Sequence, residues 1–501
     1  MRPLLLVIDA GTTSVKAAAF DEGGVLVASD SFPYPTHTPH SGWAQQDPYD
    51  YWHAAIKATK NVVSTVKAND IVAIGLCAHM NGSLVVDKTG EPVYPHIIHS
   101  DIRSTKECQT LQKIWGKEEI YKRTGNPIAV HLSLPKLLWL KNNHPPLFEG
   151  GAWFLNAKDW LRFKLTNNLG ATDYSDASLT GLFNQQKKDW DSEIASTLGI
   201  PLSMLPSIHR GTEIGGKLSP EAAQLLGLPS GIPVCYGSGD ASCATRGALV
   251  ASFSHAYAAV GSSAWVSVLT DHITEDPEMR MQHFYDIEGE LINVCGTVQS
   301  AGSALDWAAE LLAPDLSFEQ IEKMAATLGD APSPVLFLPY LSGERTPWWD
   351  AFARGAFVGL SANTDAATLL RSVYDGIAFA LKQCVKVYSH LSISVKQFSL
   401  LGGTLRGNLL ASIIAQCLNM RTAIHPWPTH ATALGAAFGS AVAVGLFPNV
   451  EKAIQQVNTT MQLIEPDKNT VASYEKQYQL YTQLYPSLQH IFRGEHESIS
   501  H

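Results

Sequence analysis

The chain has 501 residues and a formal net charge of −10, with 45% hydrophobic and 16% charged residues. This composition is typical of a globular protein, and the acidic balance without any basic run argues against a nucleic-acid partner. Because single cores rarely grow beyond about 250–300 residues, we expect more than one domain.

The chain begins with an apolar run, residues 4–10, which we interpret as a β-strand leading into a glycine turn. No small-residue cleavage site follows it, so a signal peptide is not predicted. No apolar stretch approaches the roughly 20 residues that span a bilayer, and we expect no membrane partner. The seven cysteines are scattered without a CxxC pair, which is typical of free thiols in a reducing compartment. A cytoplasmic location is therefore expected.

Strand-like and helix-like segments alternate along the first third of the chain. Two strands joined by a DEGG turn are predicted over residues 15–30, a helix over about 50–68 and a buried strand over 70–77. Directly afterwards stands AHMNG, residues 78–82, where polar side chains gather at a strand end. Such a group is either loop filler or a set of ligand contacts.

The middle of the chain repeats the arrangement of its start. Residues 230–250 predict a strand, a glycine-rich loop and a helix of small residues, and residues 255–271 predict two strands joined at Gly-Ser-Ser. Since the chain also begins with a strand, a glycine with two hydroxyl residues and a second strand, we expect two α/β lobes that each open with a hairpin. The lobes are predicted to comprise residues 1–247 and 248–501.

The first glycine turn, DAGTTSVK, has the residue types of a phosphate and metal site. Asp9 lies at the strand end, Gly11 permits a tight turn, and Thr12 and Thr13 offer hydroxyls and backbone N–H groups. Such a turn can hold phosphate oxygens while the carboxylate holds a divalent cation. The alternative is a plain β-hairpin, because short glycine motifs recur widely.

The loop GSGDAS, residues 237–242, places Asp240 between a strand and a helix. Aspartate is a favoured N-cap residue, so capping is one interpretation. The other is a catalytic base at the mouth of a cleft, and the two roles can coexist. An N-cap position would stabilise the carboxylate and weaken it as a base. Phosphoryl transfer tolerates this, because it depends more on positioning the hydroxyl than on removing its proton beforehand.

Two further glycine-rich segments are candidates for nucleotide binding. VGSSAWV, residues 260–266, supplies a second turn of phosphate-binding type, and LLGGTLRGN, residues 400–408, opens a helix. Gly402 and Gly403 would let a flat adenine approach the backbone, and Asn408 could hydrogen bond its edge; the alternative is an ordinary strand-to-helix connection. The Walker pattern and the protein-kinase motifs are absent. Together the four segments suggest a nucleotide held between two lobes.

Several longer motifs resemble the FGGY family of carbohydrate kinases, and the likeness runs through nearly the whole chain. They are GWAQQDPYDYW (42–52), HSDIRS (99–104), the segment that begins NAKDWLRFKLTNN at residue 156, YLSGERTPWWD (340–350) and GAFVGLSANTD (355–365). The resemblance implies the α/β, two-lobed actin-like ATPase (ribonuclease H-like) fold, each lobe a mixed sheet flanked by helices. It also implies ATP-dependent phosphorylation of a small-molecule sugar or polyol with Mg²⁺ as second cofactor. Since members are often dimers, a homodimer is expected.

The resemblance also assigns roles to single residues. Asp240 would receive the proton of the substrate hydroxyl, and Asp9 with Asp240 would hold Mg²⁺. The N-terminal lobe would bind the sugar and the C-terminal lobe the nucleotide. The residues expected to line the phosphates are Thr12, Thr13, Gly261, Ser262 and Ser263. Those expected to hold the adenosine are Gly302, Gly402, Gly403 and Asn408.

Two pairs of polar residues are interpreted as structural. Glu344 and Arg345 match the family's GERTP motif, and we expect an internal ion pair between them. His96 and His99 are three residues apart, but no second pair of ligands accompanies them, so we expect histidines of a loop or a strand edge.

AHMNG falls where this family binds its sugar. Xylulokinase-like members carry QMHG there; here Met80 matches the methionine, whereas His79 replaces the glutamine and Asn81 the histidine. Ala241 stands where those members carry an amide residue, and His131 matches a substrate-facing tyrosine of glycerol kinases. These departures touch positions that are expected to contact the substrate.

The expected substrate is a ketopentose such as D-xylulose, and the alternatives are another ketose, a polyol or gluconate. Three neutral polar candidates without a convergent Arg/Lys pair favour a neutral polyhydroxy ligand over a sugar acid. A different class of function is a nucleotide-binding regulator of the same fold without phosphotransfer. The retained Asp240 argues against it, because a non-catalytic protein has no chemical need for that base.

Overall fold

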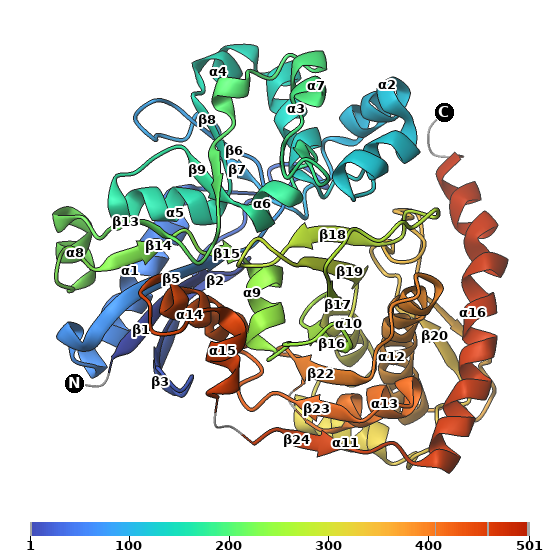
Figure 1. The fold of residues 1–501 in the computed structure, drawn as a ribbon. Helices are drawn as coiled ribbons and strands as arrows, with labels where there is room; N and C mark the ends of the chain where they lie inside the picture. Colours follow the sequence, from blue (N-terminus) through green and yellow to red (C-terminus); the bar gives the residue numbers. More distant parts are fainter. Residues whose placement is uncertain (1–2, 406, 458–459, 498–501) are drawn as a thin grey trace. The chain divides into compact units, whose positions relative to one another are not determined.

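The computed structural model describes residues 3–405, 407–457 and 460–497. Its chain divides into two compact units (Figure 1). Unit 1 comprises Met1–Ala251, Thr270–Val294 and His430–Asn458, and unit 2 comprises Ser252–Leu269, Cys295–Thr429 and Thr459–His501. The units are thus interleaved along the chain, whereas the predicted lobes are contiguous on either side of residue 247. Which lobe serves the sugar and which the nucleotide stays a prediction.

The strands are β1 (Leu4–Ala10), β2 (Ser14–Asp21), β3 (Leu26–Pro33), β4 (Gln45–Gln46), β5 (Ile71–Ala78), β6 (Leu84–Val86), β7 (His96–Ile97), β8 (Trp153–Leu155), β9 (Ala171–Asp173), β10 (Phe183–Asn184), β11 (Asp189–Trp190), β12 (Ser207–His209), β13 (Ile214–Lys217), β14 (Pro233–Cys235), β15 (Ser238–Gly239), β16 (His255–Val260), β17 (Ala264–Thr270), β18 (Gln282–Tyr285), β19 (Ile292–Val298), β20 (Leu336–Leu338), β21 (Ala356–Val358), β22 (Gln397–Leu401), β23 (Thr422–Ile424) and β24 (Gln462–Ile464). The helices are α1 (Pro48–Thr65), α2 (Thr105–Thr124), α3 (Ser133–Asn143), α4 (Pro145–Gly150), α5 (Ala157–Thr166), α6 (Tyr174–Ser178), α7 (Ser192–Thr197), α8 (Pro220–Leu226), α9 (Asp240–Gly247), α10 (Gly302–Leu312), α11 (Phe318–Ala326), α12 (Ala366–His390), α13 (Leu409–Leu418), α14 (Ala431–Ala443), α15 (Val450–Gln455) and α16 (Lys468–Glu497). Within the described part of the chain, no helix has the length and apolar character needed to cross a membrane.

Unit 1 is built on a mixed sheet with the strand order β13-β14-β5-β1-β2-β3, and β15 also pairs with β5. β1 is antiparallel to β2 and parallel to β5, so it lies inside the sheet, and every one of its residues is buried. A strand covered on both faces needs a nearly continuous apolar run, which LLLVIDA supplies. The hairpin predicted at the start of the chain is therefore confirmed.

Helices cover both faces of this sheet. Leu6 and Ile8 of β1 share a core with α1, and Leu5 and Val7 share one with α14. α14 also packs on α9, and the contact is so close that a Cβ on Gly435 would lie 1.9 Å from a backbone oxygen of α9. The late helix α14 therefore belongs to unit 1 and supports the helix that begins with the candidate base.

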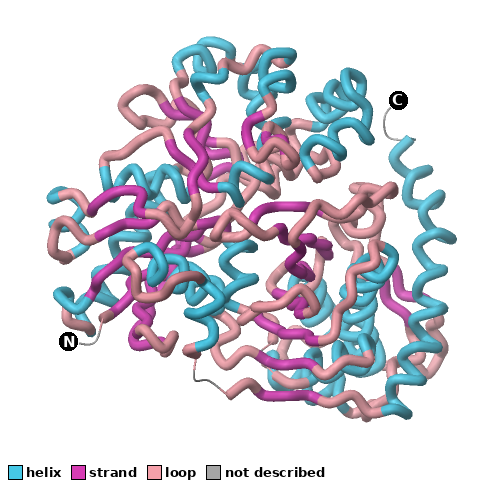
Figure 2. The backbone as a smooth tube through the Cα atoms, viewed as in Figure 1, coloured by secondary structure: helices cyan, strands magenta, loops and turns pink. Residues whose placement is uncertain are grey.

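Unit 2 repeats the arrangement of the first hairpin. Its strands follow the order β19-β17-β16-β22-β23-β24, and those from β16 to β24 lie side by side in Figure 1. β16 is antiparallel to β17 and parallel to β22, as β1 is to β2 and β5. In Figure 2 the magenta strands of each unit run alongside cyan helices. The predicted α/β fold class, with mixed sheets flanked by helices, is confirmed.

Candidate active site

Three strands of unit 1 end at the same edge of its sheet. β5 pairs in parallel with both β1 and β15, and the register sets Asp9 beside Cys77 and Cys77 beside Ser238. The residues that leave β5 and β15, His79 and Asp240, therefore start from this edge. The carboxyl ends of parallel strands are the usual place for ligand sites in open α/β sheets. The register thus brings three of the predicted site residues together.

Asp240 is the first residue of α9, and Gly239 occupies the N-cap position. Its Oδ1 accepts a hydrogen bond from the backbone N–H of Ala241 at 2.8 Å. Burial, followed by the negative charge of Asp9, raises the pKa of Asp240 to about 7, against a smaller lowering by that N–H group. Of the two interpretations, the N-cap role does not apply to Asp240, and burial with the second carboxylate raises its pKa by more than the backbone N–H lowers it. A carboxylate with a near-neutral pKa suits general-base work.

Asp9 lies buried in β1 and completes a pair of carboxylates. Burial raises the pKa of Asp9, while Lys16 and a hydrogen bond from the thiol of Cys77 lower it. Two carboxylates in one water-poor place favour protonation of each other, and a divalent cation would relieve this. No group of three or more His, Cys, Asp or Glu residues that could hold a metal occurs among the described residues. The pair nevertheless fits Mg²⁺, which needs only one or two carboxylates beside water and substrate phosphates.

The turn after β1 is anchored through its carbonyl groups. Tyr34 donates its backbone N–H to the carbonyl of Thr13 at 3.1 Å and its hydroxyl to the carbonyl of Gly11. The side-chain amide of Gln46 donates to the carbonyl of Thr12 at 2.8 Å. This anchor uses the acceptors of the turn, whereas phosphate binding would use its donors. The two roles are therefore compatible.

The segment AHMNG is packed and not loose. His79 is 1% exposed and stacks on His96, with ring centroids 5.3 Å apart and planes inclined by 19°. Burial lowers the pKa of His79 to about 4, so the ring is neutral. Among the described residues, no hydrogen-bond partner faces the nitrogens of either ring or the buried Oδ1 of Asn81. Buried polar atoms without partners are rare in proteins, and hydroxyl groups of a ligand would satisfy them.

Met80 and Gly82 are both in close contact with neighbouring residues of the site. A Cβ on Gly239 would lie 2.3 Å from Sδ of Met80, so the methionine packs directly on the residue before the candidate base. A Cβ on Gly82 would lie 1.9 Å from Nε2 of His96. His96 does lie on the short strand β7, but the prediction of a loop or edge histidine missed that its ring is fully buried. Its position before Ile97 in an apolar run was the available signal.

His131 reaches the same region through His99. Its Nδ1 lies 3.1 Å from the carbonyl oxygen of His99. The ring of His99 lies 6.1 Å, centroid to centroid, from that of His79. The structure therefore links the predicted sugar residue on the later segment with AHMNG.

Lys136 holds the backbone on both sides of His131. Its Nζ donates to the carbonyl of Val130 at 2.6 Å and to that of Leu132 at 2.9 Å. Burial lowers the pKa of Lys136 to about 7. This lysine was not among the predicted site residues, because nothing local to it indicates where its side chain goes.

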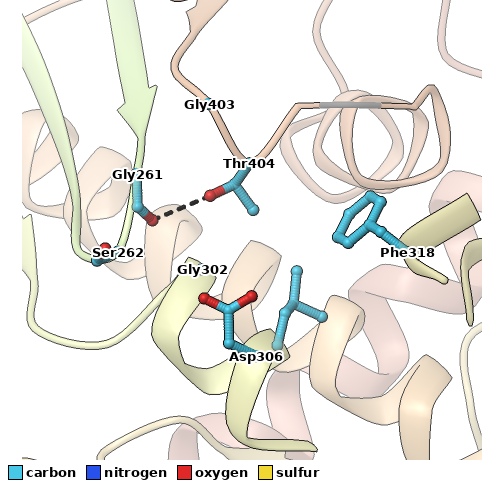
Figure 3. A pocket seen from close by; sticks show the side chains of 8 residues that line it. Gly261, Ser262, Gly302, Asp306, Phe318, Gly403 and Thr404 are labelled. Carbon is cyan, nitrogen blue, oxygen red and sulfur yellow. Dashed lines mark hydrogen bonds between the residues drawn. The ribbon is translucent and has the colours of Figure 1, made fainter. Parts of the chain in front are cut away.

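Unit 2 holds a cavity of about 210 Å³ where its glycine-rich segments meet (Figure 3). Figure 3 shows Phe318 across the cavity from Gly261 and Ser262. The lining residues are Gly261, Ser262, Gly302, Leu305, Asp306, Phe318, Gly403 and Thr404. Four predicted nucleotide residues, one or two from each of three segments far apart in the chain, thus meet here.

Hydrogen bonds join these segments into one wall. The carbonyl of Gly261 accepts the backbone N–H of Gly302 at 2.8 Å and the hydroxyl of Thr404 at 3.1 Å. The carbonyl of Ser262 accepts the backbone N–H of Ser303 at 3.0 Å. A Cβ on Gly302 would lie 2.6 Å from the carbonyl oxygen of Gly261. Only glycine therefore lets the Gly-Ser-Ser turn rest on the start of α10.

Thr12 and Thr13 belong to unit 1, and three predicted nucleotide residues of unit 2 do not line this cavity. Ser263 accepts the backbone N–H of Gly261 through its carbonyl at 2.9 Å. Gly402 has a φ of 114°, and a Cβ there would lie 2.3 Å from a backbone oxygen of β16. Asn408 is exposed and accepts a hydrogen bond from the amide of Gln462 at 3.3 Å.

Other lining residues escaped the sequence analysis. Thr404 directly follows the double glycine, and Asp306 lies one helical turn after Gly302, so both had a local signal. Phe318 begins a different helix, α11, and only the fold brings it to the cavity.

The predicted ion pair between Glu344 and Arg345 is wrong. Oε1 of Glu344 instead accepts the backbone N–H groups of Gln299 at 2.7 Å and Arg345 at 2.8 Å. Burial raises the pKa of Glu344 to about 8, which keeps the carboxyl neutral near pH 7. The charge of Arg345 lowers the pKa of Glu344, but by less than burial raises it.

Known proteins resemble this chain over almost its full length. Models of the N-terminal and C-terminal domains of the FGGY family of carbohydrate kinases match residues 4–247 and 256–444. A xylulose kinase of Klebsiella pneumoniae is 30% identical over 485 residues, which cover 96% of this chain and 98% of that protein.

Solved structures give the same result. The ligand-bound xylulose kinase of Lactobacillus acidophilus superimposes with a TM-score of 0.90 at 27% identity, covering 97% of this chain and 98% of that one. A gluconate kinase of the same organism has a TM-score of 0.89 at 27% identity, with the same coverage. These neighbours have the two-lobed actin-like ATPase fold that the sequence predicted. With both of its domain models matched, the chain belongs to the FGGY family of carbohydrate kinases, the ATP-dependent phosphotransferases of sugars.

Proposed function

We propose that this kinase transfers the γ-phosphoryl group of ATP to a hydroxyl of a ketopentose, with D-xylulose as the first candidate. The observation that carries the proposal is the carboxylate pair at one sheet edge, where burial and Asp9 raise the pKa of Asp240 to about 7. Asp240 would orient the hydroxyl and accept its proton while the new P–O bond forms. Because the transition state is loose, orientation is the larger contribution.

Mg²⁺ is the proposed metal, with Asp9 and Asp240 as its protein ligands, bound directly or through water. The ion would neutralise the charge that the phosphate oxygens bring to the site. The fit rests on the mutual electrostatic strain of the two carboxylates, which a cation removes.

The cavity of unit 2 is the proposed nucleotide site. Gly302 and Gly403 leave backbone surface for a flat adenine, and Ser262, next to Gly261 in the lining, supplies N–H and hydroxyl donors for phosphate oxygens. The exposed carboxylate of Asp306 would repel phosphates, so we place it against the ribose hydroxyls, which it can accept hydrogen bonds from. The remaining residues proposed to contact phosphates or shape the adenosine site are Thr12, Thr13, Ser263, Gly402 and Asn408.

The sugar would lie against His79, Met80, Asn81 and His131. A neutral imidazole offers one donor and one acceptor, and a hydroxyl matches both. Relatives of comparable similarity act on xylulose or on gluconate according to their names. None of the four proposed contacts carries a fixed positive charge for a gluconate carboxylate, and we therefore favour the neutral ketose.

An ADP-release assay with Mg-ATP and a panel of D-xylulose, D-ribulose, glycerol and gluconate tests the proposal. We expect saturable ADP formation with a ketopentose, at a kcat/KM at least about 10-fold above the other ligands. ATP turnover that needs no sugar and survives Asp240→Asn would overturn the kinase assignment of this site and favour a regulator. Highest activity with gluconate would overturn the substrate alone.

A further inference from the structure

A buried charge cluster lies behind the loop that carries Asp240. Nζ of Lys158 lies 2.6 Å from the carboxylate of Asp159, 3.2 Å from that of Asp173 and 3.4 Å from that of Asp176. All four side chains are 0–1% exposed. Buried ion pairs are weak evidence for stability, because dehydrating the charges offsets much of their attraction. The proposed chemistry so far gives this cluster no role.

The cluster fixes the start of the short helix α6. Burial raises the pKa of Asp176 well above its usual range, against the lowering that Lys158 causes. Burial lowers the pKa of Lys158, but the three carboxylates more than offset this and hold the ammonium charged. Asp173, held by that cation, is the N-cap of α6 and accepts the backbone N–H of Ser175 at 2.9 Å. The side chain of Ser175 is thereby set in one direction.

Ser175 connects the cluster to the residues before Asp240. Its hydroxyl donates to Oδ2 of Asp173 at 2.6 Å. It accepts the hydroxyl of Ser238 at 2.7 Å and the backbone N–H of Gly239 at 2.8 Å. One buried oxygen therefore makes three hydrogen bonds, two of them to β15.

The hydrogen bond to Ser175 matters for Gly239 because a glycine backbone is more flexible than that of other residues. A Cβ at this position would press on the thioether of Met80, and glycine restricts its own backbone least. It is also the N-cap of α9, and no side chain caps that helix. The direction in which Asp240 leaves β15 consequently depends on what holds the backbone of Gly239, and the bond to Ser175 does so.

We propose that Ser175 is a positioning residue for Asp240: its hydroxyl, held by Asp173, fixes the backbone of Gly239 and so aims the carboxylate at the substrate hydroxyl. The inference rests on the proposed role of Asp240 as the base. Ser175 touches neither sugar nor nucleotide in this scheme, so it acts on the chemical step and not on binding.

Ser178 provides a matched control on the same helix. It is as buried as Ser175, and its hydroxyl donates to the carbonyl of Tyr174 at 2.5 Å and accepts the backbone N–H of Tyr285 at 3.2 Å. Each serine-to-alanine change therefore removes one buried hydroxyl and leaves one backbone N–H without its acceptor. Only Ser175→Ala frees the residue before Asp240.

The test compares Ser175→Ala, Ser178→Ala and Asp240→Asn in the full-length protein, by kcat, by KM for sugar and for ATP, and by melting temperature. We expect Ser175→Ala to lower kcat about 10–100-fold with both KM values within about twofold, because a misaimed catalytic group costs rate and not affinity. Ser178→Ala should lower the melting temperature to a similar extent and keep kcat within about twofold. Ser175→Cys keeps the shape of the side chain in a slightly larger form but weakens the acceptor, and its kcat should fall in the same direction.

Several outcomes would overturn the inference. Unchanged kcat in a folded Ser175→Ala protein, or an equal loss in Ser178→Ala, would reduce Ser175 to a structural role. Failure of both Ser175 variants to fold beside a folded Ser178→Ala would do the same. If Asp240→Asn itself keeps full activity, the proposed base is wrong; if Asp240→Asn is inactive while Ser175→Ala is normal, only the positioning role fails.

Discussion

The two units place different chemistry on the same arrangement of strands. In unit 1 the hairpin β1–β2 and the parallel strand β5 end among buried carboxylates and neutral imidazoles. In unit 2 the hairpin β16–β17 and the parallel strand β22 end at glycines, backbone groups and hydroxyls around a cavity. A buried carboxylate can be tuned for proton transfer, whereas glycine and backbone recognise a flat base and phosphates through shape. In the proposed function, the same strand pattern therefore carries the reacting groups in unit 1 and the nucleotide contacts in unit 2.

The largest expected effect comes from replacing Asp240 of unit 1 by asparagine, and the same change at Asp306 of unit 2 is the comparison. Asp240→Asn should lower kcat about 100- to 10,000-fold, because the general base is lost. Asp306→Asn in the cavity of unit 2 should leave kcat intact and raise KM for ATP a few-fold. Steady-state kinetics with the preferred sugar measures both, and a comparable loss of kcat in Asp306→Asn would contradict the division of labour.

The free energy of unfolding should depend on pH because of His79, the buried imidazole at the sheet edge of unit 1. Burial lowers the pKa of His79 to about 4, below its value of about 6.5 in an unfolded chain. The unfolded state therefore binds more protons, so the stabilisation is complete above about pH 6.5 and falls as the pH approaches 4, by about 3 kcal/mol for this residue.

Urea unfolding at several pH values between 7 and 4.5 measures this loss. His79→Gln should flatten the decline in unfolding free energy, whereas His53→Gln, on an exposed side chain of α1, should not. Equal slopes in wild type and His79→Gln would show that the ring is not held neutral.

Substitutions of two glycines in unit 2 can distinguish a residue that forms the cavity wall from one that contacts the nucleotide. Gly302→Ala should lower the melting temperature and raise KM for ATP about 10-fold, because the new Cβ collides with the carbonyl oxygen of Gly261. Gly403 has open space where a Cβ would lie, so Gly403→Ala should keep the melting temperature. A rise of KM in Gly403→Ala without any loss of stability would place the nucleotide on that residue, and an unchanged KM would remove it from the site.

The smallest expected effect concerns Lys136, which lies beside the proposed sugar site. Lys136→Met should raise KM for the sugar about 3- to 10-fold and leave KM for ATP unchanged, because the carbonyls on both sides of His131 lose their donor. Lys141 lies on the same helix and donates to the carbonyl of Leu198, so Lys141→Met is a matched control. A loss of sugar affinity in both variants would point to α3 as a whole and not to His131.

Local sequence patterns predicted the helices and strands better than they predicted which unit each element joins. The hairpins and the buried strand before AHMNG follow from apolar runs and glycine turns, which are properties of neighbouring residues. The interleaving of the units does not, because residues 270–294 and 430–458 join unit 1 through contacts made far along the chain. A helix of small residues predicts close packing but not the partner.

The site shows the same limit. Asp9 and Asp240 could be named from their strand ends, but the pKa of Asp240 depends on burial and on Asp9, neither of which its neighbours in sequence reveal. His96 was missed because its contact with His79 crosses from one strand to another. Asn408 was predicted to hydrogen bond the adenine edge, but it does not line the cavity, and its side-chain oxygen accepts a hydrogen bond from Gln462.

The position of α14 late in the sequence has a consequence for the biosynthesis of the protein. Leu5 and Val7 leave the ribosome more than 400 residues before the end of the helix that covers them, since α14 ends only at Ala443. That face of the sheet must stay shielded, by the nascent chain itself or by a chaperone, for most of translation. A fragment that stops at residue 247 would expose the same apolar face permanently, so we expect it to aggregate rather than fold.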